Sequence, residues 1–155
     1  MTANEKQIGG RHYKTEYEHW DLAIKIPLGY LEGNTTKYVS RARKKGGLQD
    51  YYKARHYLDK MIECYWLMVH PCDEIEETIL QEVNKFARAN NLTLGEEAYI
   101  LAICTYTKKA DLIAAKMLLE DIIIDMQQQS LLHKAEEPDY PGTPADGGHH
   151  EAGNL

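Results

Sequence analysis

Large apolar side chains recur in this chain at helical spacing, and this periodicity constrains the fold more than any other feature. Between residues 48 and 69, and again between 110 and 133, they return every three or four positions. No segment alternates apolar and polar residues over the length of a strand. Because a period of three to four residues is typical of amphipathic helices and a period of two of strands, the sequence predicts an all-α fold.

Proline, glycine and asparagine residues divide this pattern into six segments. Pro27, Gly46-Gly47, Pro71 and Asn90-Asn91 stand where the apolar periodicity stops, and such residues commonly end helices. The chain should therefore fold as a compact bundle of five to six helices. We expect these helices over residues 17–26, 28–45, 48–69, 73–89, 94–107 and 110–133.

The formal net charge of -6 is distributed unevenly along the chain. Residues 1–70 hold 12 Lys/Arg against 8 Asp/Glu, and residues 71–134 hold 6 against 11. The remaining residues, 135–155, hold none against 5 and are rich in Pro and Gly, so we expect a disordered acidic tail. The chain then consists of a basic module, 1–70, and an acidic helical module, 71–134. The break between them is too short for a flexible linker, so the two modules should pack together.

Three cysteines, Cys64, Cys72 and Cys104, are widely spaced and odd in number, which is typical of reduced thiols in a cytosol. No apolar run approaches the roughly 18 residues of a membrane span. The first residues lack the apolar stretch of a signal peptide. We therefore expect a cytoplasmic protein without a membrane partner.

The second expected helix carries a cationic stripe. Asn34, Lys37, Arg41 and Lys45 recur at i, i+3, i+7 and i+11, which places them on one side of a helix, with Lys44 close by. Like charges on one side of a helix repel, so the stripe requires acidic groups from elsewhere in the fold or an anionic ligand. Phosphate suits both arginine and lysine. The alternative is a solvated helix end without a ligand.

The third expected helix adds a cation and several tyrosines. An antiparallel pairing of the second and third helices would bring Lys53 near Arg41 or Lys45. Tyrosines at helical spacing can stack on a base, but they more often fill a core or an interface. Both roles remain open for these tyrosines, which are Tyr51, Tyr52, Tyr57 and Tyr65.

The N-terminal segment also has residues that suit a nucleotide. Gly9 and Gly10 would let backbone N–H groups approach a phosphate closely. The residues that follow supply a cation and two rings for stacking on a base, namely Arg11, His12 and Tyr13. A Gly-Gly pair is also common in plain turns.

Established phosphate and metal motifs are absent from the sequence. There is no GxxxxGK[ST] loop, no GxGxxG after a strand and no HExxH, so a P-loop kinase is excluded. Two carboxylate pairs, Glu74 with Glu77 and Asp121 with Asp125, have a spacing that can hold Mg²⁺ between helices. They leave a magnesium-dependent nucleotide pyrophosphohydrolase as an alternative. We assign no metal ligand, because helix capping already explains the first pair and the second flanks three consecutive isoleucines.

Four ordered blocks resemble the small phage SaV-like family, whose members are often described as phage nucleotide kinases. The blocks are GGRHYK at 9–14, EGNTTKYVSR at 32–41, KGGLQD at 45–50 and KARHYL at 53–58, and the resemblance covers about residues 7–64. It implies an oligomeric phage protein of the host cytoplasm that phosphorylates deoxynucleoside monophosphates without a P-loop, with ATP as the donor. The polar family positions here are His12, Tyr13, Glu32, Asn34, Lys37, Arg41, Lys45, Asp50 and Lys53.

The stripe and the resemblance together predict a protein that binds a nucleotide-like phosphate ligand. We expect Arg11, His12, Tyr13, Asn34, Lys37, Arg41, Lys45 and Lys53 to contact that ligand. In a kinase, Glu32 or Asp50 would orient the acceptor. The alternative is a non-catalytic protein that sequesters a nucleotide signal of bacterial defence. Nucleic acid is a poorer fit, because the basic module has an excess of only four cations.

The sixth expected helix is apolar over a broad face. Ile122, Ile123 and Ile124 follow one another, and one neighbouring helix covers such a face poorly. We therefore expect a homo-oligomer that assembles through the acidic module. The alternative is that this helix completes the core of a monomer.

Overall fold

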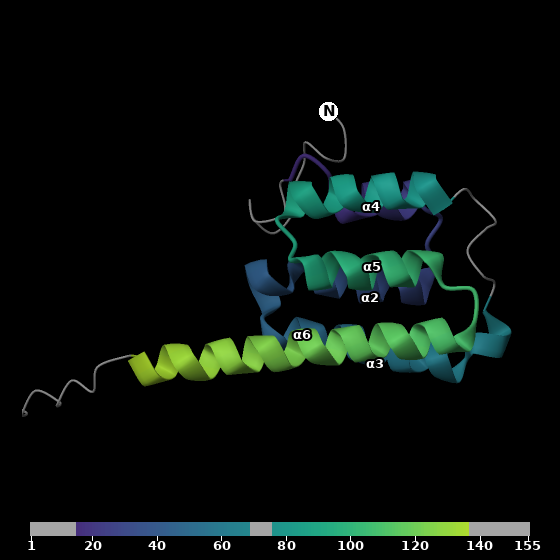
Figure 1. Cartoon of the computed structure of the whole chain (residues 1–155). Coiled ribbons are helices and arrows are strands. Elements are labelled where there is room, and N and C mark those ends of the chain that lie inside the picture. The colour runs from purple at the N-terminus through teal and green to yellow at the C-terminus, as the bar shows by residue number, and fades with distance from the viewer. Residues whose placement is uncertain (1–14, 69–75, 137–155) are drawn as a thin grey trace, which may run out of the picture.

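The computed structural model of the chain describes residues 15–68 and 76–136, and within these ranges it contains helices and no strand (Figure 1). The predicted all-α class is therefore confirmed. A π-helical turn, η3 (Ala42–Gly46), joins the second helix to the third, and a short 3₁₀ turn, η4 (Tyr65–Leu67), follows the third. The α-helices are α1 (His19–Lys25), α2 (Tyr30–Arg41), α3 (Leu48–Glu63), α4 (Glu76–Asn90), α5 (Leu94–Thr105) and α6 (Lys109–Glu136).

The boundaries of these helices differ from the predicted ones mainly at three places. The expected helix 48–69 ends as an α-helix at Glu63, and η4 follows it. The expected helix 28–45 ends as an α-helix at Arg41, and η3 continues it with a wider turn. That turn is closed by a hydrogen bond of 2.7 Å from the Gly47 N–H to the Ala42 carbonyl, five residues back. At the other end, α6 continues to Glu136, so the first two residues of the expected tail are helical.

The helices form two layers (Figure 1). One layer is α1, α2 and α3, and the other is α4, α5 and α6, with neighbours packed side by side in each. α5 lies against α2, α6 against α3, and α4 against α1. The two layers come from the segments predicted as the basic and the acidic module, and these segments pack together as expected.

A single hydrophobic core joins the two layers. Leu22, Val39 and Leu58 of the first layer are fully buried, as are Phe86 and Ile103 of the second. Within the described residues, no helix combines the length and the apolar character that crossing a membrane requires.

Buried tyrosine hydroxyl groups fix the layers relative to each other. Tyr51 donates a hydrogen bond of 2.5 Å to the Glu96 carboxylate, which is 1% exposed. The Tyr106 hydroxyl donates one of 2.7 Å to the buried carboxylate of Glu32. A buried acceptor without a donor is costly, so these bonds specify how the layers align.

Candidate functional site

Two glycines build the tight connection between α2 and α3. Gly47 has φ +52° and ψ −143°, a backbone conformation that residues with a side chain rarely adopt. At Gly46, a Cβ atom would lie 2.1 Å from Cγ of Asp50. The glycine pair therefore lets the end of η3 pack directly against the first turn of α3.

Asp50 lies buried at this connection and binds two cations. Its carboxylate accepts hydrogen bonds of 2.8 and 3.2 Å from Nε and Nη2 of Arg41, and one of 3.1 Å from Nζ of Lys53. Burial alone would raise the pKa of Asp50, but the hydrogen bonds and charges of Arg41 and Lys53 outweigh it and hold the pKa below its usual value. Asp50 thus fixes the positions of both cations, which the expected antiparallel pairing brings together.

Three tyrosines lie beside these two cations. The Tyr38 ring lies 4.6 Å from the Arg41 guanidinium and 5.3 Å from Nζ of Lys53, both within the range of cation–π attraction. Tyr57 stacks on Tyr38 with ring centroids 5.7 Å apart, and Tyr30 meets Tyr57 edge-on at 6.1 Å. We call Tyr30, Tyr38, Arg41, Lys53 and Tyr57 the tyrosine–cation face.

The cationic stripe of α2 runs along this face only in part. Asn34 donates a hydrogen bond of 2.7 Å to the Tyr30 carbonyl, and Lys37 is exposed one turn before Arg41 on the same side of the helix. Lys45 is exposed in η3. Lys44 points away to α4, where Nζ donates to Oδ1 of Asn90 at 3.1 Å.

Glu32, the other predicted catalytic residue, does not lie with the cations. It is two residues beyond Tyr30, which places it on the opposite side of α2, facing α5. There it is 3% exposed and bound to Tyr106. Of the predicted catalytic pair, the structure therefore brings only Asp50 to the tyrosine–cation face.

Other predicted residues lie outside the described part of the chain. Arg11, His12 and Tyr13 are among them, as is Glu74 of the first carboxylate pair. The same holds for the expected tail beyond Glu136. The second carboxylate pair, Asp121 and Asp125, is exposed on α6. Among the described residues there is no group of three or more His, Cys, Asp or Glu that could hold a metal ion.

The four tyrosines whose role the sequence left open lie in different surroundings. Tyr51 and Tyr65 are buried in the core. Tyr57 belongs to the tyrosine–cation face, where hydrogen bonding to Tyr30 raises its pKa. Tyr52 is half-buried and accepts a hydrogen bond of 3.0 Å from the Gln127 amide.

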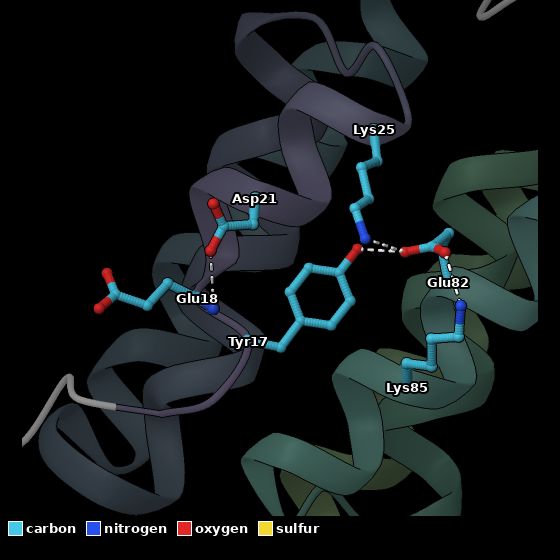
Figure 2. A network of polar contacts seen from close by, with 6 residues as sticks. All are labelled: Tyr17, Glu18, Asp21, Lys25, Glu82 and Lys85. Carbon is cyan, nitrogen blue, oxygen red and sulfur yellow. Dashed lines mark hydrogen bonds and ion pairs between the residues drawn. The ribbon is translucent and has the colours of Figure 1, made fainter. Parts of the chain in front are cut away.

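Sequence reasoning missed a second polar cluster, between α1 and α4 (Figure 2). Glu82 accepts hydrogen bonds of 2.6 Å from the Tyr17 hydroxyl, 2.9 Å from Lys25 and 3.0 Å from Lys85. These donors, Tyr17 first, lower the pKa of Glu82 to about 2. The only local signal was the i, i+3 spacing of Glu82 and Lys85, because Lys25 comes from α1 and Tyr17 from the segment before it.

The cluster borders an open hollow of about 690 Å³ on the surface. Acidic and basic side chains both line this hollow, so its charges largely compensate one another. We therefore take the tyrosine–cation face as the candidate site. The lining residues of the hollow are Glu16, Tyr17, Asp21, Lys25, Lys85, Arg88 and Ala89.

Comparison with known proteins gives one finding. Residues 9–59 match the model of a family described as a protein of unknown function, DUF3310. This match spans about a third of the chain and includes every residue of the tyrosine–cation face. A search of curated proteins and a search of solved structures return no match. Because the matched family carries no assigned function, the kinase expectation stays a prediction.

Proposed function

We propose that this protein binds a nucleotide-like phosphate ligand at the tyrosine–cation face. The observation that carries the proposal is the joint position of Arg41 and Lys53, which Asp50 fixes beside the ring of Tyr38. A nucleotide combines an aromatic base with an anion, and this face offers both complements within one helical hairpin.

The electrostatic support comes from the charge balance of the face. Arg41, Lys53 and the neighbouring Lys37 carry three positive charges against the single carboxylate of Asp50. The face therefore keeps a positive excess, although the whole chain carries a net charge of -6. Because Asp50 holds Arg41 and Lys53 before the ligand arrives, less side-chain entropy is lost on binding.

The aromatic support comes from Tyr30. Tyr30 is 75% exposed. A tyrosine ring is largely apolar, so its exposure to water is unfavourable unless something covers it. Tyr30 lies two helical turns, about 11 Å, before Lys37 along α2. Stacking of a base on an aromatic ring contributes about 1–3 kcal/mol, so an exposed ring at this distance from the cations suits the base end of the ligand.

The state of Asp50 favours binding without turnover. Both of its carboxylate oxygens accept hydrogen bonds from Arg41 or Lys53, and the group is buried. A carboxylate held in this way positions cations and is poorly placed to orient an acceptor hydroxyl. We therefore favour sequestration of the ligand over phosphoryl transfer.

Titration calorimetry with each deoxynucleoside monophosphate tests binding. We expect Tyr30→Ala and Lys37→Gln each to weaken binding about tenfold, which corresponds to about 1.4 kcal/mol. Lys108→Gln, an exposed lysine between α5 and α6, is the matched control and should bind like the unaltered chain. Equal affinities in all four proteins would contradict the proposal.

A coupled assay with ATP and each deoxynucleoside monophosphate tests turnover. We expect no ADP above the rate of a heat-denatured control. ADP production that is lost in Lys37→Gln and kept in Lys108→Gln would show that the kinase alternative is correct and that sequestration is wrong.

A further inference from the structure

α6 presents an apolar stripe that no described element covers. Ile113, Met117, Ile124 and Leu131 lie on one side of the helix, away from α3 and α5, and are between 47% and 67% exposed. The opposite side, with Leu119 and other buried residues, fills the core. We call these four exposed residues the outer stripe of α6.

The C-terminal part of α6 extends past the two layers (Figure 1). Up to His133, Ile123 is the last buried residue of this helix, and every side chain from Gln127 to His133 is exposed. Leu131 and Leu132 in this extension are 67% and 66% exposed. Short helices without packing partners are marginal in water, so an extension with exposed leucines indicates that another surface packs against it.

The spacing of the outer stripe indicates which surface this is. Met117, Ile124 and Leu131 follow one another at intervals of seven residues, the spacing of the seam between paired helices. We propose that two copies of this chain pair through their α6 helices in an antiparallel orientation, with Ile124 at the centre. Met117 of one copy then meets Leu131 of the other, which buries apolar side chains on both sides of Ile124.

Charges favour the antiparallel orientation. With Ile124 at the centre, Asp121 of one copy lies opposite Gln127 of the other, and Asp125 lies opposite Ile123. A parallel pairing in register would place Asp121 and Asp125 opposite their own counterparts, where like charges repel.

The same charges disfavour the chain's own C-terminal segment as the occupant. Residues 137–155 hold four acidic residues and no Lys or Arg. Glu120, Asp121 and Asp125 make this part of α6 acidic as well. This repulsion disfavours the segment, whereas the antiparallel register places Asp121 and Asp125 opposite uncharged residues of a second copy, which is therefore the better partner for the outer stripe.

Sedimentation of the full chain over a range of concentrations tests the pairing. We expect a dimer at tens of micromolar. Ile124→Lys or Met117→Lys should raise the dissociation constant at least tenfold, with helicity by circular dichroism unchanged. Gln129→Lys adds the same charge to α6 away from the stripe and should leave the dissociation constant unaltered. A monomer at all concentrations, or a dimer that tolerates both stripe variants, would overturn the proposal.

Cross-linking tests the orientation. Met117→Cys and Leu131→Cys, mixed with one of them size-tagged, should form disulfide-linked heterodimers, and each alone should not cross-link above the background of the unaltered chain. Cross-linking of each variant with itself would show a parallel pair and overturn the antiparallel model. The α6 variants used in sedimentation leave the tyrosine–cation face unchanged, so the test of dimerisation is independent of the proposed nucleotide binding.

Discussion

At the scale of single residues, the connection between α2 and α3 depends on Gly46. Its missing side chain provides the space that the Asp50 carboxylate occupies between Arg41 and Lys53. Asp50 in turn fixes both cations of the tyrosine–cation face. The site is therefore sensitive to one methyl group at a position that does not itself face a ligand.

Gly46→Ala tests this dependence. The new Cβ would lie 2.1 Å from Cγ of Asp50, so the carboxylate must move, and we expect the free energy of unfolding to fall by about 1–3 kcal/mol. Gly33→Ala in α2 is the matched control, because no atom lies within 4 Å of its Cβ and alanine favours a helix. Urea unfolding of both variants measures the difference. Equal stability of the two would show that Gly46 is not needed for space.

His19 gives the fold a dependence on pH. Its ring lies half-buried against Phe86, with Nε2 2.9 Å from the Thr36 hydroxyl. Burial, and to a lesser degree the charge of Lys37, lowers the pKa of His19 to about 4. The unfolded chain has a histidine pKa near 6.5 and therefore binds the proton more readily, so the free energy of unfolding should fall as pH decreases from about 6.5 to about 4.

Urea unfolding at pH 7 and pH 5 measures this effect. His19→Gln should lose most of the decrease in stability between these values, which we expect to be about 1–2 kcal/mol. His56→Gln, which alters an exposed histidine of α3, should keep it. A decrease of the same size in His19→Gln would mean that other groups cause it.

At the scale of elements, the sequence predicted which segments form α-helices, but it did not predict where the helical geometry changes. Apolar spacing and breakers such as Gly46-Gly47 located all the α-helices that the structure describes. The π-helical turn η3 was missed, because Ala-Arg-Lys-Lys-Gly has no local feature that distinguishes it from the end of an α-helix.

The candidate site was predictable to the same extent. Residues of one helix, such as Lys37 and Arg41, were grouped correctly because helical spacing fixes their common side. The stacking of Tyr38 on Tyr57 depends on how α2 is rotated against α3, which the pattern of either helix alone leaves open. Asp50 was identified as a polar residue of the site, but its burial between two cations follows from the same packing.

The alignment of the layers leads to a prediction about two adjacent tyrosines. Tyr51→Phe removes a donor from the buried Glu96 carboxylate, so we expect a loss of about 1.5–3 kcal/mol in the free energy of unfolding. Tyr52→Phe makes the same chemical change at a hydroxyl near the surface and should cost no more than about 0.5 kcal/mol. Thermal unfolding compares them, and similar losses would contradict the role of the buried bond.

At the scale of the whole molecule, charge and assembly are divided between the two layers. The first layer holds the tyrosine–cation face, and the second holds α6 with its exposed outer stripe. The net charge of -6 therefore says little about the ligand, because the positive excess is local to the first layer. In the proposed dimer, pairing through α6 would involve the layer that does not carry the site.

Mass spectrometry of small molecules released from the purified full chain by heat tests the central claim most directly. The account predicts a nucleotide-like phosphate compound, unaltered and near one equivalent per chain, that is strongly reduced in Lys37→Gln and retained in Lys108→Gln. Release of no such compound, or of equal amounts from both variants, would contradict it.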